Sequence, residues 1–258
     1  MNYLKKIDRN FDDLAEKFNR KIYGGLKGDI RLAVIWRDLN GFINNRKSSK
    51  PLNIIDIGAG LGQFAIRLSE LGHHVTYNDV SKNMLDLAQK SAIKQGQISN
   101  IIWQHCAYQD LTSQDLGKYD LVLCHALIEW LAEPEALIAK LADLKTLDGS
   151  ISLTFYNANA LVYQNLIKGN FKVLESPFQA DSKSLTPHTP FTPKVITTWV
   201  TNVGLCVVKS SGIRVFHDYV TTRRGGHVND EAVINKELEY SEVDPYKWLG
   251  RYVHFMLE

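Results

Sequence analysis

The sequence predicts an α/β fold, a doubly wound and mostly parallel sheet with helices on both faces. Short apolar runs alternate with helical stretches of about 10–15 residues over residues 53–156, which is typical of parallel strand–helix–strand units. A glycine-rich turn, Gly58–Gly62, follows the first apolar run and opens a helical stretch. The composition, 45% hydrophobic and 22% charged, allows a large core and excludes an intrinsically disordered chain.

The central part of the chain contains this alternation, and single residues mark where elements begin and end. Gly72 and Gly149 each break a helical stretch. Ser81 precedes another and is suited to cap its N-terminus, because its hydroxyl can accept a hydrogen bond from a backbone N–H. The expected strands are residues 53–57, 74–78, 101–106, 119–124 and 150–156, and the expected helices are residues 63–71, 82–95 and 135–144.

The two ends of the chain lie outside this alternation. Residues 8–45 have the spacing of amphipathic helices on both sides of a break at Tyr23–Gly25. Beyond the fifth strand we expect helices at 157–171, 194–202 and around 230–239, the last acidic and facing solvent, and strands at 205–209, 213–217 and 252–257, with a proline-containing loop at 172–193. We therefore describe one domain with a helical extension (1–50), a ligand-binding core (51–156), an insertion (157–193) and a C-terminal part of the sheet (194–258).

Nothing in the sequence indicates secretion, a membrane span or a metal site. The cysteines, Cys106, Cys124 and Cys206, form no CxxC pair and have no spacing of metal ligands. The N-terminus is charged, and no apolar run approaches the roughly 18–20 residues that cross a bilayer. We therefore expect a cytoplasmic protein without a bound metal.

The formal net charge of +2 conceals an uneven distribution. Basic residues outnumber acidic ones by 12 to 6 in residues 1–50 and by 8 to 3 in residues 151–227. Acidic residues outnumber basic ones by 12 to 7 in residues 51–150 and by 7 to 3 in residues 228–258. Phosphates respond to charge within a Debye length of about 8–10 Å, so two basic segments around an acidic core are compatible with a nucleic-acid partner. Ordinary variation among solvated helix surfaces would also produce this pattern.

The glycine-rich turn indicates a nucleoside ligand. Gly58 permits a tight turn after a strand, and Gly60 lets the backbone approach a ligand closely. A dinucleotide-binding turn would have its third glycine at position 63, where this chain has Gln63; the third glycine is Gly62 instead. This spacing resembles the first motif of class I S-adenosylmethionine (SAM) methyltransferases. A nicotinamide-dependent oxidoreductase is therefore disfavoured.

Four further residues, at the carboxyl ends of three strands, fit such a ligand. Asp79 ends the second strand about 20 residues after the turn, where a carboxylate accepts both ribose hydroxyls. Tyr108 and Gln109 follow the third strand and are expected to contact adenine. His125 ends the fourth strand beside the expected methyl-donor pocket. Two of these residues have a structural alternative, a capping role for Asp79 and a core position for His125.

Several blocks outside the turn carry a more specific resemblance. They are Asp8–Phe18, Arg20, Ile22–Gly24, Lys27–Gly28, Arg31, His125–Ala126, Glu129–Trp130, Phe155–Ala158, Gly169–Phe171, Gly212–Tyr219 and Leu249–His254. Over almost the whole chain they resemble the bacterial tRNA 5-carboxymethoxyuridine methyltransferases. The resemblance implies a Rossmann-like sheet of seven strands and SAM-dependent esterification of the carboxymethoxy group on a wobble uridine of tRNA.

The resemblance also assigns the residues that contact the methyl donor. These are Arg31, Gly58, Ala59, Asp79, Tyr108, Gln109 and His125. A guanidinium such as that of Arg31 is suited to bind the carboxylate of the donor in bidentate geometry.

The acceptor chemistry requires positioning rather than a general base. A carboxylate with an unperturbed pKa near ~4 is already nucleophilic at neutral pH. We predict that Tyr156 and Asn157, at the end of the fifth strand, and Arg214 position the acceptor. Arg20, Tyr23 and His217 are further candidates for binding the substrate. The alternative is that Arg214 and His217 only stabilise the sheet edge.

Two other functions remain open at the level of sequence. A class I methyltransferase for a small-molecule carboxylate or another acceptor would need the same glycine turn and Asp79, but would leave the basic segments without a role. A non-catalytic SAM-binding protein would be expected to have lost the blocks at Phe155–Ala158 and Gly212–Tyr219, which are intact.

Overall fold

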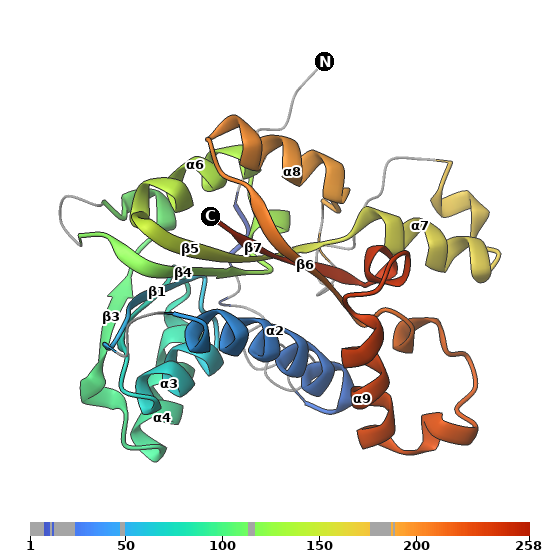
Figure 1. Cartoon of the computed structure of the whole chain (residues 1–258), viewed down its shortest axis with the longest axis horizontal. Helices are drawn as coiled ribbons and strands as arrows, with labels where there is room; N and C mark the ends of the chain where they lie inside the picture. The colour runs from blue at the N-terminus through green and yellow to red at the C-terminus, as the bar shows by residue number, and fades with distance from the viewer. Residues whose placement is uncertain are drawn as a thin grey trace.

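A single seven-stranded sheet runs through the centre of the molecule in the computed structural model (Figure 1). The structure describes residues 8–10, 12, 24–46, 50–112, 117–175, 187 and 189–258. The strands are β1 (Asn53–Ile57), β2 (His74–Asp79), β3 (Ile101–His105), β4 (Tyr119–His125), β5 (Lys145–Tyr156), β6 (Val207–Ile213) and β7 (Tyr252–Leu257). Their order is β3-β2-β1-β4-β5-β7-β6. The first five pair in parallel, and β7 lies antiparallel between β5 and β6.

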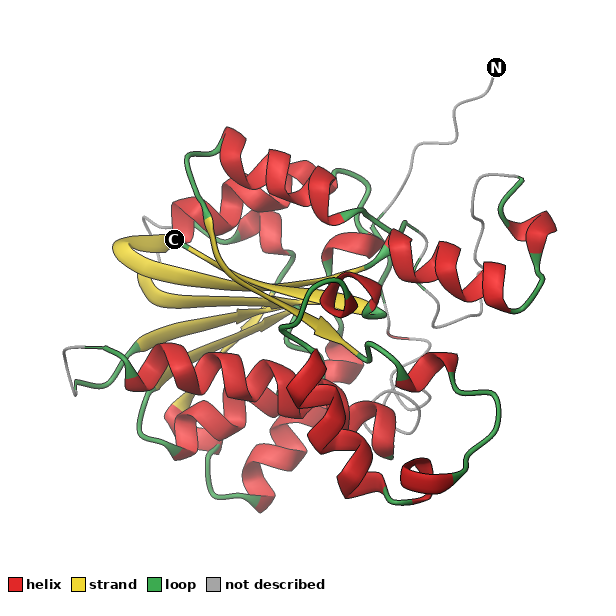
Figure 2. Ribbon diagram, turned by 45° about the vertical axis from the view of Figure 1, so that its right-hand side comes forward, coloured by secondary structure: helices red, strands yellow, loops and turns green. Residues whose placement is uncertain are grey.

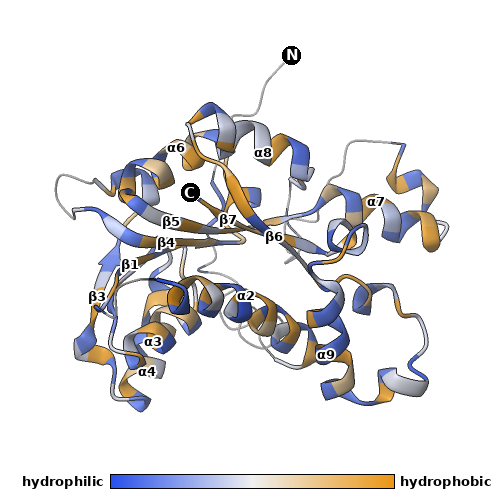
Figure 3. Ribbon diagram, in the orientation of Figure 1, coloured by the Kyte–Doolittle hydropathy of each residue, from blue (hydrophilic) through white to orange (hydrophobic). Residues whose placement is uncertain are grey.

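Helices cover both faces of this sheet (Figure 2). The helices are α2 (Leu26–Asn44), α3 (Gln63–Glu70), α4 (Lys82–Lys94), α6 (Pro134–Leu144), α7 (Ala158–Ile167), α8 (Pro193–Asn202) and α9 (Asp230–Tyr240). Hydrophobic residues of α2, α3 and α4 pack on one face, and those of α6 and α8 pack on the other. Helices α2 and α3 carry both hydrophobic and hydrophilic residues, as Figure 3 shows, which suits a position between core and solvent. The predicted doubly wound, mostly parallel sheet is confirmed.

The local signals of the central region have the predicted effects. The Ser81 hydroxyl accepts a hydrogen bond from the backbone N–H of Met84 and caps α4. Strand β1 is buried at four of its five positions, as expected for a strand covered on both faces. The spacing of Leu32, Ile35 and Leu39 predicts a helix, and these residues lie in α2. Of the helical pattern expected before the Tyr23–Gly25 break, nearly all lies outside the described residues.

Two expected boundaries around β5 and α7 are wrong. Strand β5 begins at Lys145 rather than at residue 150, and Gly149 lies within it. A Cβ at position 149 would lie 2.8 Å from the carbonyl oxygen of Tyr119, so glycine here allows two strands to approach rather than ending a helix. Helix α7 ends at Ile167 instead of 171. Gly169, with φ of 69°, then adopts the left-handed conformation typical of a helix C-terminus.

The two strands expected at 205–209 and 213–217 are one strand, β6, which ends at Ile213. Strand β6 ends there because Arg214, with a φ of 60°, directs the chain away from the sheet. The next three backbone N–H groups, of residues 215–217, then donate to the carboxylate of Glu237 at 2.7, 3.2 and 2.8 Å. A long-range contact, not local propensity, therefore determines where β6 ends.

Helix α9 does not face solvent as expected. It packs against α2, and Val233 and Glu237 are buried. Glu237 is fully buried because its carboxylate accepts the three backbone N–H groups after Arg214. Burial raises the pKa of Glu237, and these backbone hydrogen bonds counter the rise. In the part of the chain that the structure describes, no helix is both long and apolar enough to cross a membrane.

Candidate functional site

The turn after β1 brings backbone to the carboxyl edge of the sheet. Gly58 and Gly60 have φ of 64° and 55°, a conformation that side chains other than glycine rarely adopt. The Gly60 N–H donates to Asp79 at 2.8 Å, and the Tyr77 hydroxyl donates to the Gly60 carbonyl at 2.6 Å. The turn is therefore fixed to β2 before any ligand binds.

The carboxylate of Asp79 connects two loops at this edge. One oxygen accepts from Gly60 N–H, and the other accepts from Ser81 N–H at 2.8 Å. Burial raises the pKa of Asp79, whereas these two hydrogen bonds lower it. Beneath it, burial and the charge of Asp79 raise the pKa of Asp56 to about 8. Each Asp79 oxygen keeps a lone pair that can accept a ribose hydroxyl.

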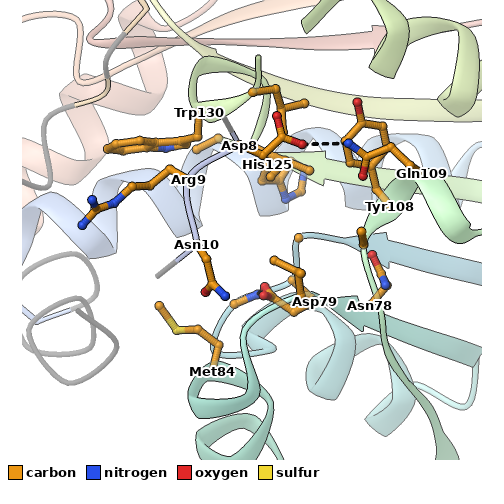
Figure 4. Close-up of a pocket in the computed structure, with 18 of the residues that line it drawn as sticks. Asp8, Arg9, Asn10, Asn78, Asp79, Met84, Tyr108, Gln109, His125 and Trp130 are labelled. Atoms are coloured by element: carbon orange, nitrogen blue, oxygen red, sulfur yellow. Dashed lines mark hydrogen bonds between the residues drawn. The ribbon is translucent and has the colours of Figure 1, made fainter. Parts of the chain in front are cut away.

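A pocket opens beside this turn and contains every residue predicted to contact the methyl donor (Figure 4). Arg31 comes from α2, Asp79 from β2, and His125 from the end of β4. Sequence reasoning gave no role to several other residues in the wall. The full lining consists of Asp8, Arg9, Asn10, Arg31, Gly58, Ala59, Gly60, Asn78, Asp79, Val80, Met84, Ala107, Tyr108, Gln109, His125, Ala126, Leu127, Trp130, Leu131 and Tyr252.

The two ends of this pocket differ in chemistry. At one end Tyr108 is buried, and burial raises its pKa to about 12, so its phenol stays protonated. The neighbouring Gln109 donates its amide to Asp8 at 2.7 Å, the contact drawn in Figure 4. At the other end the Arg31 guanidinium stacks 4.2 Å from the centre of the Tyr252 ring. The pocket thus pairs an aromatic and amide end with a cationic end, which fits adenine and an amino-acid carboxylate.

Beyond Tyr252 lies a second group of side chains, which we call the arginine–tyrosine cluster: Tyr156, Arg214, Asp218, Arg251 and Tyr252. The rings of Tyr156 and Tyr252 are 5.7 Å apart. Arg251 stacks on Tyr156 at 4.8 Å, and Arg214 lies 5.7 Å from the Tyr252 ring. Within the described residues, the buried Tyr156 hydroxyl and Arg214 Nε have no hydrogen-bond partner.

The charges of this cluster favour an anion. Asp218 pairs with Arg214 at 3.5 Å and with Lys27 at 3.6 Å, so its one negative charge is shared by two cations. Burial lowers the pKa of the Arg214 guanidinium, which the charge of Asp218 counters. A carboxylate between Arg214 and Tyr156 could accept from both, whereas Asp218 Oδ1, which also has no hydrogen-bond partner among the described residues, is an acceptor in the same cluster.

The remaining predicted acceptor residues lie in different places. Asn157 is buried, and its amide donates to the carbonyls of Trp248 and Gly250 at 2.8 and 2.9 Å while its oxygen caps α7 through Asn159 N–H. Its side chain therefore connects the end of β5 to the segment before β7, and both amide N–H groups are already used. His217 lies beside Asp218, and burial lowers its pKa. Arg20 and Tyr23 lie outside the described residues.

Comparison with known proteins places the chain in a family. A family model described as a methyltransferase domain matches residues 54–149. The chain is 38% identical to the tRNA 5-carboxymethoxyuridine methyltransferase of Escherichia coli K12 over 96% of its own length and 95% of that protein. The chain belongs to this family. It is also 27% identical to a ubiquinone biosynthesis O-methyltransferase of Coxiella burnetii, over 67% of this chain and 71% of that protein.

Solved structures agree with the family in fold. Magnesium protoporphyrin IX methyltransferase from Synechocystis PCC 6803 with bound SAH has a TM-score of 0.64 at 19% identity, over 96% of this chain and 95% of that one. The PH0226 protein of Pyrococcus horikoshii has a TM-score of 0.60 at 12% identity, over 94% and 97%. At these identities the likeness establishes the methyltransferase fold alone.

In this member of the tRNA 5-carboxymethoxyuridine methyltransferase family, the N-terminal segment Asp8–Asn10 with Asp12 crosses the pocket as a strap. Asp8 accepts hydrogen bonds from Ala132 N–H and from Gln109, both at 2.7 Å. Asp12 accepts from the Ser81 hydroxyl at 2.5 Å. The strap therefore joins the loops that follow β2, β3 and β4. The expected helix from residue 8 is therefore wrong for residues 8–10, which are not helical, because the periodic pattern begins only at Phe11.

Replacing Asp8 with alanine should speed the release of S-adenosylhomocysteine by about tenfold. The change removes two hydrogen bonds that hold the strap over the pocket, each worth about 0.5–1.5 kcal/mol. Stopped-flow fluorescence of the complex measures the rate. The matched control is Asp29→Ala on the exposed side of α2, which should leave the rate unchanged. A normal release rate in Asp8→Ala would show that the strap does not retain the ligand.

Proposed function

We propose that this chain transfers the methyl group of SAM to the carboxylate of 5-carboxymethoxyuridine at the wobble position of tRNA, forming the methyl ester. The observation that carries the proposal is the pair of buried, unpartnered donors Tyr156 OH and Arg214 Nε beside the ligand pocket. Asp218 Oδ1 also lacks a hydrogen-bond partner among the described residues, but Lys27 and Arg214 share its charge, so the two unpartnered donors fit a carboxylate substrate better than a phenol or an amine. Membership of the family supports the same substrate.

The residues of the pocket fit the methyl donor. Arg31 would bind its carboxylate, Asp79 its ribose hydroxyls, and Tyr108 with Gln109 its adenine. The buried His125 Nδ1, which has no hydrogen-bond partner among the described residues, is a further group that a bound ligand would satisfy. When bound, SAM supplies an electrophilic methyl group on a sulfonium.

The protein itself must align the acceptor carboxylate with the methyl group. No general base is needed, because the acceptor carboxylate is ionised at neutral pH. Tyr156 and Arg214 would hold one carboxylate oxygen and orient the other toward the methyl group. Burial raises the pKa of Tyr156 to about 12, so its hydroxyl remains a donor. Asn157 would act only indirectly, by fixing the end of β5 that carries Tyr156.

The proposal is tested with a matched pair of tRNAs. One carries 5-carboxymethoxyuridine, and the other has the same sequence with unmodified uridine. With SAM labelled in the methyl group, only the modified tRNA should acquire label. Equal labelling of both, or label on a small carboxylate such as the free nucleoside at the same efficiency, would favour the small-molecule alternative.

Basic side chains around the cluster would contact the phosphates of the anticodon arm. Lys168, Lys172 and Arg224 are exposed, and so is Lys27, which pairs with Asp218; Arg223 pairs with Asp230. Lys17, Arg20 and Lys21 lie outside the described residues.

We place this reaction in the cytoplasm. We assign it to one domain, because all seven strands lie in one sheet.

Binding of tRNA should weaken steeply as salt rises. Three or more phosphate contacts would reduce the affinity by more than about tenfold between ~50 and ~200 mM monovalent salt, because each contact releases counterions. Filter binding or fluorescence anisotropy over a salt series measures the slope. An affinity that does not change with salt would contradict a phosphate-binding surface, and SAM binding measured over the same series serves as the control.

A further inference from the structure

A buried glutamate on α9 binds a stretch of backbone that lies about 20 residues earlier in the chain. Glu237 Oε2 accepts a hydrogen bond from the Val215 N–H at 2.7 Å. Its Oε1 accepts from the N–H groups of Phe216 and His217 at 3.2 and 2.8 Å. Three successive N–H groups that converge on one acid group form a concave anion-binding turn. Glu237 lies outside the wall of the ligand pocket, so any effect on that site must act through this turn.

The turn carries both partners of an ion pair in the arginine–tyrosine cluster. Arg214 precedes the three N–H groups and Asp218 follows them, and their side chains pair at 3.5 Å. A strand rises about 3.3 Å per residue, so Cα atoms four residues apart in a strand would be separated by roughly 13 Å. That separation is too long for this pair. The ion pair therefore requires the chain to turn where β6 ends.

The turn also opposes a backbone preference. Arg214 has a φ of 60°, in the left-handed region, where Cβ crowds the following carbonyl oxygen. A residue other than glycine keeps such a conformation where surrounding contacts compensate its cost. The hydrogen bonds from residues 215–217 to Glu237 supply this compensation. Without them an extended or right-handed backbone would be favoured, and the Arg214 side chain would point in another direction.

Glu237 is held in place by its own helix. Helix α9 packs against α2 (Figure 1). The Asn229 side chain caps the start of α9, and Arg37 of α2 donates to a carbonyl near its end at 2.8 Å. Helix α2 also carries Arg31, which would bind the carboxylate of the methyl donor. Glu237 therefore connects the turn after Arg214 to the helix pair that carries a donor-binding side chain.

We propose that Glu237 is a positioning residue for the methyl transfer: by binding the backbone of residues 215–217, it fixes the turn that places the Arg214 guanidinium in the arginine–tyrosine cluster. This inference rests on the proposed function, in which Arg214 binds the acceptor carboxylate. Glutamate suits the task because both of its oxygens accept hydrogen bonds. A glutamine amide has one oxygen, and its nitrogen would face a backbone N–H, donor against donor.

The test combines Glu237→Gln with Arg214→Ala. Glu237→Gln alone should lower kcat/KM for the modified tRNA by about 10- to 100-fold, because at least one buried N–H loses its acceptor. The Kd for SAM should stay within about twofold, because the donor pocket is a separate site. If Glu237 acts through Arg214, the double variant should be as active as Arg214→Ala to within about twofold. Losses that multiply in the double variant, or an unchanged kcat/KM in Glu237→Gln, would overturn the proposal.

The control variant is Asn229→Ala, which weakens the N-terminal cap of the same helix about two turns before Glu237. It should lower the thermal midpoint but keep kcat/KM within about twofold. A loss of activity as large as that of Glu237→Gln would show that any weakening of α9 has this effect. Such a result would refute a specific role for Glu237.

A second measurement needs no substitution. In the ¹⁵N-labelled wild type, the amide protons of Val215 and His217 should exchange slowly with solvent, because both are bonded to Glu237. Exchange at the rate of unprotected amides would refute the hold of Glu237 on the turn. A wild type that does not methylate the modified tRNA would instead refute the proposed function, so the two failures are distinguishable.

Discussion

Replacing Arg214 with alanine should lower kcat/KM for the modified tRNA by about 100- to 1,000-fold and leave the Kd for SAM within about twofold. Removal of one preorganised donor from a site that holds an oxyanion typically has an effect of this size. The guanidinium lies mostly buried in the arginine–tyrosine cluster, outside the pocket wall that would hold the donor. Initial rates with modified tRNA and calorimetry with SAM measure the two quantities separately.

Two comparisons make this result specific. Arg214→Lys keeps the charge but not the planar fork, so it should recover only part of the activity. Arg223→Ala removes an exposed arginine nearby that pairs with Asp230, and should change kcat/KM by no more than a few-fold. Equal losses of activity and SAM affinity in Arg214→Ala would show that Arg214 supports the structure of the sheet edge, as the sequence alternative holds.

Replacing Asp79 with alanine should weaken SAM binding by about 100-fold or more. The variant would lose two hydrogen bonds from ribose hydroxyls to a charged acceptor, each worth about 1.5–3 kcal/mol. It would also release Gly60 N–H and Ser81 N–H, which hold the glycine turn and the start of α4 to this carboxylate. Calorimetry with S-adenosylhomocysteine measures the loss directly.

The matched control is Asp110→Ala, which removes an exposed carboxylate outside the pocket wall. This control should bind S-adenosylhomocysteine as the wild type does. An unchanged affinity in Asp79→Ala would remove Asp79 from the ribose role and leave it as a residue that only connects two loops.

The donor side of the site was predictable because its signals are local. The glycine turn and Asp79 lie at the ends of neighbouring parallel strands, and such strand ends meet at one edge of a sheet. Six of the seven residues taken from the resemblance lie in one pocket for the same reason, and the seventh, Arg31, reaches this pocket from α2. Their contacts with a ligand remain predictions.

The acceptor side depends on contacts between distant parts of the chain. The left-handed backbone at Arg214 depends on the carboxylate of Glu237, which lies more than 20 residues later in the chain. The sequence around Ile213 contains no local signal that predicts this conformation. Asn157 had the right place at the end of β5, but its amide is occupied by Trp248 and Gly250, some 90 residues away. Strand propensity and sheet position predict where a residue lies, but not whether its polar groups remain available.

The most direct test of the central claim is nucleoside mass spectrometry. The protein is incubated with SAM and with tRNA that carries 5-carboxymethoxyuridine, and the tRNA is then digested to nucleosides. We predict that the modified uridine gains the mass of one methyl group and that mild alkali reverses the gain, because an ester hydrolyses and an N- or C-methyl group does not. A 5-carboxymethoxyuridine of unchanged mass, or a methyl group stable to alkali, would contradict methylation of the carboxylate.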